Sequence, residues 1–132
     1  GWVGMEARVV APVTFEGSPI DVVIDADFGS ARAELIVREA SGREVAREGV
    51  PVSGGVFAWV GRNASGQPLN DGNYTLELAS IREGQVTSTE PVPYYADVTE
   101  ARRSSDGIEL VVTGGSVVSA TSVTALRQPG ES

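Results

Sequence analysis

Hydrophobic and polar residues alternate along short segments of this chain, and turn-forming residues separate the segments. The sequence contains 16 glycines and seven prolines, which recur at short intervals. The stretches between them are about 5–10 residues long and rich in Val, Ile, Thr and aromatic residues, the composition of β-strands. No window of about 11 residues or more carries the period of an amphipathic helix. The pattern predicts an all-β fold of about ten short strands, arranged as a sandwich, a barrel or both.

The clearest strand is predicted at residues 20–28. A turn at Phe28-Gly29-Ser30 leads into a second strand at residues 31–39, whose outward positions carry Arg32, Glu34 and Arg38. The outward positions of the first strand carry Asp21, Asp25 and Asp27. Because these acidic residues would face the arginines of the second strand, the two strands are predicted to form an antiparallel pair with one face in water. The inward positions of the pair are Ile20, Val22, Ile24, Ala26, Phe28, Ala33, Leu35 and Val37.

Further strands are predicted at residues 43–47, 56–60, 74–78, 86–90, 95–103 and 108–113, with a last apolar piece at 117–126. Hairpin turns are predicted at residues 82–85 and 104–107. Pro91-Val92-Pro93 predicts a linker or a sheet edge, since prolines rarely occupy central strands. The tail, residues 128–132, is expected to fray. Strand alternation predicts a sandwich core of Ile20, Val22, Ile24, Leu35, Val37, Phe57, Trp59, Tyr74, Leu76 and Leu78.

The composition removes most catalytic chemistry. The chain has no histidine, cysteine or lysine, so all ten basic residues are arginines. Without His and Cys, the Ser-His and Cys-His nucleophile arrangements and structural zinc sites cannot form. Without Lys, there is no Schiff-base amine and no P-loop lysine. Only carboxylate chemistry remains, so we predict a protein that is not an enzyme, with no cofactor and no metal site.

The net charge of −8 argues against two classes of partner. An acidic surface repels nucleic acid and anionic lipid, and no apolar run approaches the length of a membrane helix. We therefore predict no nucleic-acid partner and no membrane partner. Since the chain opens on Gly1-Trp2 without an initiator Met, we also expect it to be a piece of a longer protein.

The stretch from Gly55 to Leu78 has the most informative spacing. It resembles the pattern F-x-W-D-G-x-d-x-x-G-x-x-L-x-D-G-x-Y-x-x-x-V of the immunoglobulin-like domain of bacterial flagellar hook-capping proteins, the FlgD family. The aromatic pair is expected to fill the gap between two sheets, and the glycines to allow positive φ. The Leu and the Tyr resemble a tyrosine corner, in which the Tyr hydroxyl bonds the backbone upstream. The matching residues are Phe57, Trp59, Gly61, Gly66, Leu69, Asp71, Gly72 and Tyr74.

The two ends of the chain carry a second resemblance to the same family. Residues 2–9 resemble the segment L-I-G-K-x-V that opens the folded part of these proteins, with Gly4 at the glycine, and residues 95–126 resemble its closing part. The resemblance covers nearly the whole chain. It implies a fibronectin type III/immunoglobulin-like sandwich at residues 14–90, inserted into a small Tudor-like barrel formed by residues 1–13 and 91–127.

The resemblance also implies a function. Hook-capping proteins are scaffolds at the growing tip of the flagellar hook, outside the cytoplasm, and are exported by the flagellar secretion apparatus. The implied partners are flagellar hook subunits and further copies of the chain itself, in a homo-oligomeric cap to which an N-terminal segment missing here contributes. This piece alone is expected to self-associate only weakly, because the area from that segment is absent.

One position departs from the family pattern. The pattern has Asp after the Trp, and this chain has Val60. If that Asp bonds the backbone of the following loop, the loop must be held in another way here. Asn63 is the residue expected to replace it.

Two groups of polar residues carry alternative interpretations. Asp21, Asp25 and Asp27 are either a solvated strand face or a metal site, and the first is favoured because the other ligands of a calcium loop are absent. The glycosylation sequons at Asn63 and Asn73 are favoured as ordinary turn chemistry.

The exposed and aromatic candidates are similarly open. Trp2 is either core of the barrel, which is favoured, or an exposed anchor for a partner. Of Tyr94 and Tyr95, one ring should point inward and the other outward, toward a contact between the two lobes. Arg102-Arg103 is favoured as a mixed-charge edge that discourages strand pairing over a site for an acidic partner.

Two rival functions remain. The chain is alternatively an immunoglobulin-like accessory or binding module of a secreted or surface protein, in which case residues 1–10 would not pair with residues 95–127. A carboxylate-only hydrolase would require two facing carboxylates about 5–10 Å apart in a cleft.

Overall fold

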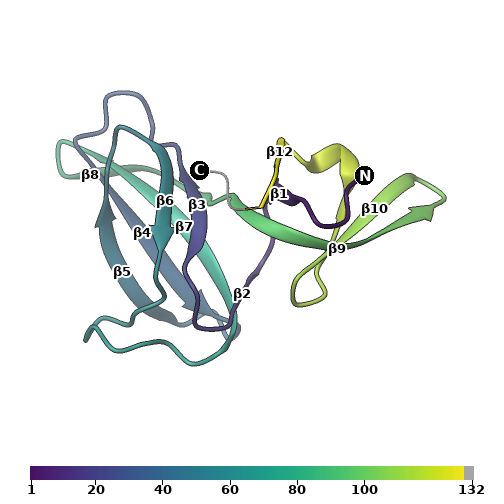
Figure 1. Cartoon of the computed structure of the whole chain (residues 1–132). Coiled ribbons are helices and arrows are strands. Elements are labelled where there is room, and N and C mark those ends of the chain that lie inside the picture. Colours follow the sequence, from purple (N-terminus) through teal and green to yellow (C-terminus); the bar gives the residue numbers. More distant parts are fainter. Residues whose placement is uncertain (130–132) are drawn as a thin grey trace. The chain divides into compact units, whose positions relative to one another are not determined.

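The computed structural model describes residues 1–129 and divides the chain into two compact units. The central unit is Pro12–Val92. The terminal unit combines Gly1–Ala11 with the chain from Pro93 onward, so the central unit is inserted between its two halves. Figure 1 shows that both units are built from strands, which confirms the predicted all-β class. The frayed tail expected at residues 128–132 lies largely outside the described residues.

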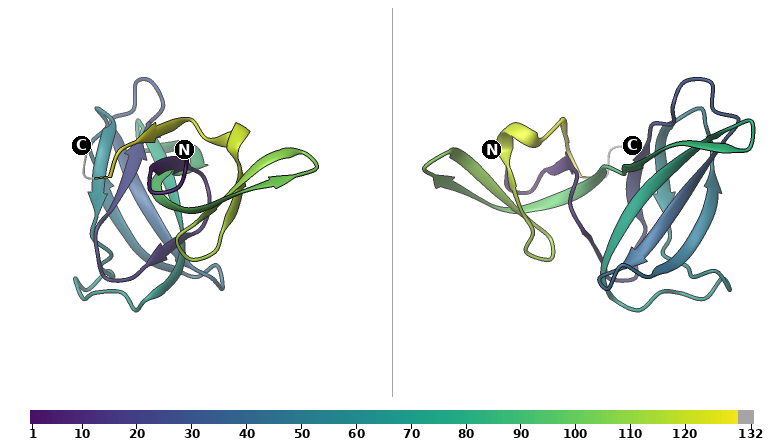
Figure 2. Two further views of the ribbon diagram at one scale, coloured as in Figure 1. Left: turned by 45° about the vertical axis from the view of Figure 1, so that its right-hand side comes forward. Right: turned by 180° about the vertical axis from the view of Figure 1, so that it is seen from behind.

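The central unit is a sandwich of two unequal sheets. The larger sheet has the order β2-β7-β4-β5, and β8 pairs with β7 beyond the end of β2. The smaller sheet is the antiparallel pair β3–β6. Figure 2 shows from behind that β4, β5 and β7 form one continuous layer. The bounds are β2 (Val13–Phe15), β3 (Ile20–Ile24), β4 (Arg32–Glu39), β5 (Glu44–Val50), β6 (Gly55–Trp59), β7 (Gly72–Arg82) and β8 (Gln85–Pro91).

The core of the central unit follows the period-two pattern of its strands. Most of the predicted core residues are buried, namely Val22, Ile24, Leu35, Val37, Trp59, Tyr74, Leu76 and Leu78. Ile20 and Phe57 are only half-buried. Phe15, which strand alternation did not place in the core, is 2 % exposed and lies at its centre. β4 also buries Ile36 on its second face.

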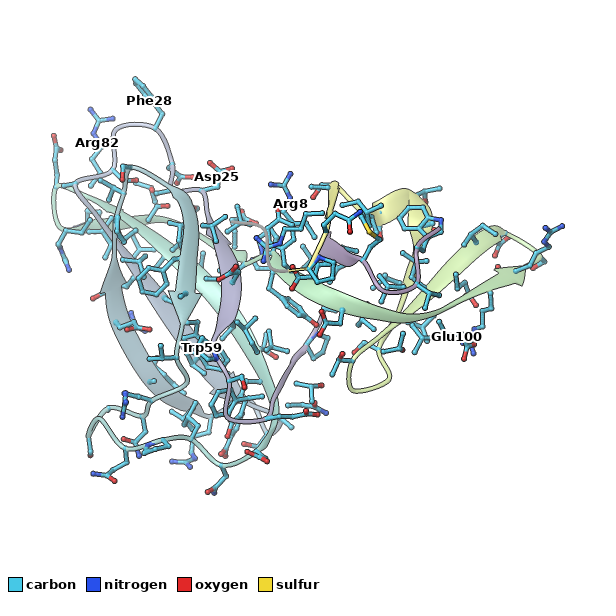
Figure 3. The ribbon with its side chains drawn as sticks, viewed as in Figure 1. Arg8, Asp25, Phe28, Trp59, Arg82 and Glu100 are labelled. Atoms are coloured by element: carbon cyan, nitrogen blue, oxygen red, sulfur yellow. The ribbon has the colours of Figure 1, made fainter. Side chains whose placement is uncertain are left out.

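The predicted pairing of the first two strands is wrong. β3 ends at Ile24 and pairs with β6, whereas β4 pairs with β5 and β7 in the opposite sheet. The turn between them crosses from one sheet to the other. Asp27 fastens it there, since its backbone N–H donates to Ser80 Oγ at 2.9 Å on β7. Phe28, predicted to point inward, is fully exposed at this turn, as Figure 3 shows.

Charged residues line the outer face of the larger sheet. Arg38 Nε lies 2.7 Å from Glu77 Oε1, joining β4 to β7. Arg47 on β5 bonds Glu34 at 3.2 Å and Glu44 at 2.9 Å. Opposite charges across neighbouring strands stabilise antiparallel pairing, although exposed pairs contribute only about 0.2–1 kcal/mol each. This face is the wet face that the outward charges of residues 31–39 predicted.

The terminal unit is one curled sheet with the order β11-β10-β9-β1-β12. Its core contains Ala7, Val9, Tyr94, Ala96, Val98, Leu110 and Val112. The predicted hairpin at residues 104–107 is confirmed, with Gly107 opposite Ser104. The apolar piece at 117–126 is two short strands separated by a 3₁₀ turn. The bounds are β1 (Glu6–Val9), β9 (Tyr94–Ser104), β10 (Gly107–Val112), β11 (Val117–Ser119), η1 (Ala120–Ser122) and β12 (Ala125–Arg127).

Candidate functional site

Trp59 is the centre of an aromatic cluster that joins the two sheets of the central unit. It ends β6, points inward and is 1 % exposed (Figure 3). Its ring centroid lies 5.4 Å from that of Phe15 and 6.2 Å from that of Tyr74, in tilted and edge-on geometries. Such pairs stabilise by about 0.5–1.5 kcal/mol beyond the area they bury. Phe57, two residues earlier, is half-buried and is not part of this cluster.

Gly61 closes the cluster from the loop side. Its φ of +72° lies in the left-handed region, which favours glycine. A Cβ atom on Gly61 would lie 2.4 Å from Cε1 and Cζ of Phe15. The position therefore requires glycine twice, for backbone conformation and for space. Gly66 also has positive φ, +81°, but nothing lies within 4 Å of its Cβ position.

The loop after β6 is a small hairpin stapled by its own groups. Leu69 N donates to Gly61 O at 2.8 Å, and Asn63 N to Gln67 O at 2.8 Å. Asn63 Oδ1 accepts from the backbone N–H of Ser65 at 2.9 Å and of Gln67 at 3.0 Å. Asn63 thus performs the backbone bonding that the sequence assigned to it in place of an Asp at residue 60.

Tyr74 forms the corner that the spacing of residues 69–74 resembled. Its hydroxyl donates to Asn70 O at 2.6 Å, four residues upstream. Burial raises the pKa of Tyr74, and the negative charges of Glu39 and Asp71 raise it further, so the hydroxyl is neutral and remains a donor. Leu69 is half-buried, whereas Asp71 and Gly72 are exposed where β7 begins.

A cleft of about 480 Å³ lies beside this loop, lined among others by Glu39, Arg43, Glu44 and Asn63. The carboxylates of Glu39 and Glu44 accept hydrogen bonds from Arg43 and Arg47. Hydrogen bonds from Arg43 and Ser41 lower the pKa of Glu39, and one from Arg47 lowers that of Glu44. Both groups are ionised near neutral pH, which suits salt bridging and gives no poised general acid.

The three aspartates of the first strand region are dispersed by the structure. Asp21 lies on β3, Asp25 is exposed after the strand, and Asp27 Oδ2 accepts from Thr87 Oγ1 at 2.6 Å. Hydrogen bonds from Thr87 and Ser88 lower the pKa of Asp27. Within residues 1–129, no three His, Cys, Asp or Glu side chains are grouped so that they could hold a metal ion. The same residues include no helix long and apolar enough to cross a membrane.

In the terminal unit, Gly4 turns the chain into β1. Its φ is +87°, and its N–H donates to Val98 O on β9 at 3.0 Å. Trp2, just before this turn, is half-buried. Gly4 thus belongs to the pairing of the two chain ends and lies in a different unit from the other predicted family-motif residues.

A polar contact fastens the last strand of the terminal unit. Arg127 Nε on β12 donates to Glu6 Oε1 on β1 at 2.8 Å, and both side chains are less than one-fifth exposed. The guanidinium carbon lies 3.8 Å above the ring of Tyr95, a cation–π geometry. The outward tyrosine of the predicted pair is Tyr95, since Tyr94 is buried. On the hairpin β9–β10, Arg102 lies 3.4 Å from Glu109 and 3.9 Å from Glu100, a mixed-charge surface.

Sequence reasoning missed Phe15. A signal was present, because Val13 and Phe15 alternate with Thr14 directly after Pro12. Three residues are too short for a pattern to stand out, and only the pairing of Phe15 with Gly72 places its ring beside Trp59.

Comparisons with known proteins agree with this geometry. The model of the FlgD Ig-like domain family matches residues 9–84. FlgD from Xanthomonas campestris, described for hook capping essential for flagellar assembly, superimposes with a TM-score of 0.81 at 23 % identity, covering 95 % of this chain and 94 % of that one. FlgD from P. aeruginosa superimposes with a TM-score of 0.75 at 18 % identity, covering 96 % of this chain and 98 % of that one.

A truncated FlgD from Helicobacter pylori gives a TM-score of 0.51 at 15 % identity, covering 99 % and 97 %. At these identities the structural matches establish the fold alone. Among curated proteins, no sequence matches the chain. Because the family model spans more than half of the 132 residues, and confirms the resemblance carried by Trp59, Gly61 and Tyr74, this chain belongs to the FlgD Ig-like domain family.

Proposed function

We propose that this chain is a structural scaffold of flagellar hook assembly that acts as part of a cap at the growing hook tip. Membership of the FlgD Ig-like domain family is the observation that carries the proposal. The likeness of both units to FlgD of Xanthomonas campestris, a protein described for hook capping, supports it. On this proposal the chain is exported by the flagellar secretion apparatus and works outside the cytoplasm.

The chemistry of the described residues suits a scaffold better than an enzyme. Three residues of the family pattern have structural tasks, since Trp59 and Tyr74 pack in the core and Gly61 allows the close approach of the loop to Phe15. The carboxylates of the cleft beside the loop, Glu39 and Glu44, are bonded to arginines. We therefore propose that function lies in protein–protein contacts with hook subunits and with further copies of this chain. Neither nucleic acid nor a membrane is a proposed partner, because the net charge is −8.

The pairing of the chain ends supports the scaffold over an accessory module of a secreted enzyme. β1 pairs with β9 over four residues and with β12 over three. An appended immunoglobulin-like module needs no such second unit. In the FlgD structures that resemble this chain, nearly the whole length superimposes, so the terminal unit is shared as well.

Deletion of the gene in its source bacterium tests the proposal. The expected result is loss of hooks by electron microscopy, with hook subunits accumulating unassembled in the medium, and recovery of both when the gene is restored. Normal hooks in the deletion strain overturn the proposal. Normal hooks together with weakened hydrolysis of an extracellular glycan would favour the accessory module.

A further inference from the structure

The outer edge of β6 is an unguarded sheet edge. On one side, β6 pairs with β3 along its whole length, from Ile20 opposite Trp59 to Ile24 opposite Gly55. Across residues 1–129, no other strand pairs with β6. A strand edge with free N–H and C=O groups is a template for another strand, unless charge, proline or a bulge blocks it.

The sequence along this edge contains none of those blocks. From Ser53 to Gly61 there is neither a charged residue nor a proline. The outward positions are apolar and exposed: Val56 is 52 % exposed, Val60 is 46 % exposed, and Ala58 between them is also exposed. The other outer strands of the unit differ, because β5 carries Arg47 and Glu48 and β8 ends in Glu90-Pro91.

We propose that β6 pairs antiparallel with β6 of a second copy of this chain, with the two-fold axis at Ala58. The segment Val56-Phe57-Ala58-Trp59-Val60 is palindromic in residue kind, with valines outside, aromatics next and alanine at the centre. Two-fold pairing therefore sets Val56 opposite Val60 of the second copy and Ala58 opposite Ala58. Each cross-strand pair on the outward face is apolar, and the β3–β6 pairs of the two copies become continuous through the two β6 strands.

Charge also fits a second copy at this place. Each chain carries −8, so most surfaces of two copies repel. Along β6 there is no charge, and on the neighbouring strand β3 Asp21 lies opposite Ala58. In the pair, the two Asp21 residues stand three strand spacings apart, about 14 Å, which exceeds the screening length of about 8 Å at physiological salt. The repulsion that remains comes from the net charge of −8 on each chain. Because added salt screens this repulsion, it should strengthen the association.

The contact is small. Two five-residue strands bury far less than the roughly 1,200 Å² of a standard interface, so the pair is weak and transient when this chain is alone. The inference deepens the proposed self-association in a hook cap, and its biological meaning rests on that proposal. The pairing itself rests on β6 alone.

Single cysteines test the register, since the chain has no cysteine of its own. Opposite residues of antiparallel strands form either hydrogen-bonded or non-hydrogen-bonded pairs. In both kinds their Cα atoms lie about 4.5–5.5 Å apart, within disulfide range. Ala58→Cys should therefore form disulfide dimers in a glutathione redox buffer. Val56→Cys alone should not, because the two copies of residue 56 are about four residues, or roughly 14 Å, apart along the strands. A mixture of Val56→Cys and Val60→Cys chains should cross-link as a heterodimer.

Val86→Cys sets the collisional background, since Val86 is 58 % exposed on β8. Dimer yields at least tenfold above this background for Ala58→Cys, and at background for Val56→Cys alone, are expected. Equal yields for all three variants, or Ala58→Cys chains that capture only another polypeptide, overturn the pairing.

A charge on the edge tests the same contact without covalent chemistry. Ala58→Lys should remove the concentration-dependent rise in sedimentation coefficient, while Val86→Lys, with the same charge change, should retain it. Unchanged circular dichroism confirms that both variants fold. A wild-type chain that stays monomeric at millimolar concentration overturns the pairing whatever the hook phenotype is. Conversely, normal hooks after gene deletion overturn the proposed function while leaving the cross-linking result intact.

Discussion

Replacing Gly61 with alanine should destabilise the central unit more than any other glycine-to-alanine change in the loop after β6. The new Cβ would lie 2.4 Å from two ring carbons of Phe15. That ring is 2 % exposed and is held by Trp59 and Tyr74, with centroids 5.4 and 6.5 Å away. It cannot swing away without disturbing the cluster, so either the ring or the loop backbone must shift.

The expected loss in the free energy of unfolding of Gly61→Ala has two parts. Alanine at φ +72° costs about 1–2 kcal/mol because its Cβ crowds the backbone in the left-handed region. Overpacking against Phe15 adds about 1–3 kcal/mol. Gly66→Ala is the matched control, since it has φ +81° in the same loop and open space around its Cβ position. It should show the first part alone, so the two variants should differ by about 1–3 kcal/mol.

Urea unfolding followed by tryptophan fluorescence measures these values for the central unit. The measurement should use a Trp2→Phe background. The chain has two units, and Trp2 lies in the terminal unit, so without it the fluorescence reports only on Trp59 in the central unit. Adding Phe15→Leu should restore part of the loss in Gly61→Ala and none in Gly66→Ala, as a double-mutant cycle would register. Equal free energies of unfolding for Gly61→Ala and Gly66→Ala would refute the close-approach reasoning and leave only backbone strain.

Three further results are expected. Trp59→Ala should lower the free energy of unfolding by about 3–5 kcal/mol, and an unchanged melting temperature would place Trp59 outside the core. Tyr74→Phe should cost about 0.5–1.5 kcal/mol through loss of the bond to Asn70 O, whereas a neutral effect in urea unfolding would make the corner incidental. Burial raises the pKa of Tyr94 from 10.0 to about 12, so the stability it contributes is complete below pH 10 and is lost as pH rises toward 12. That loss should be on the order of 2–3 kcal/mol, and Tyr94→Phe should flatten it in melting curves across this range; an identical slope in wild type and variant contradicts the assignment.

The sequence predicted inward and outward positions well and strand partners less well. Alternation depends only on the side-chain period within one strand, so Val22, Leu35 and Leu76 could be assigned to the core without knowledge of their neighbours. Partners depend on where a turn delivers the chain. The segment around Asp27 has the composition of a tight turn, yet it crosses between the sheets because Ser80 and Thr87 bind it there.

The spacing of motif residues predicted the candidate site better than the alternation of hydrophobic and polar residues did. The order of glycine, Leu69 and Tyr74 resembled a loop and corner that the structure contains, since each such residue meets a backbone requirement that lies within about ten positions of it. Phe15 could not be found in this way. Its role depends on Gly61 and Trp59, which lie more than 40 residues further along the chain and come together only through sheet pairing.

Val60 connects the loop to the edge of the small sheet. The family pattern has Asp at this position, and that carboxylate would place a charge on the outward face of β6. Here Asn63 holds the loop through two backbone N–H groups, so residue 60 is no longer needed for that task. Its valine is 46 % exposed and extends the apolar series of Val56 and Ala58. Val60→Asp should therefore leave the loop bonded by Asn63 and the melting temperature nearly unchanged, while weakening the association of two copies. If the variant instead unfolds the loop and leaves self-association intact, Val60 serves packing and the edge of β6 is not the contact.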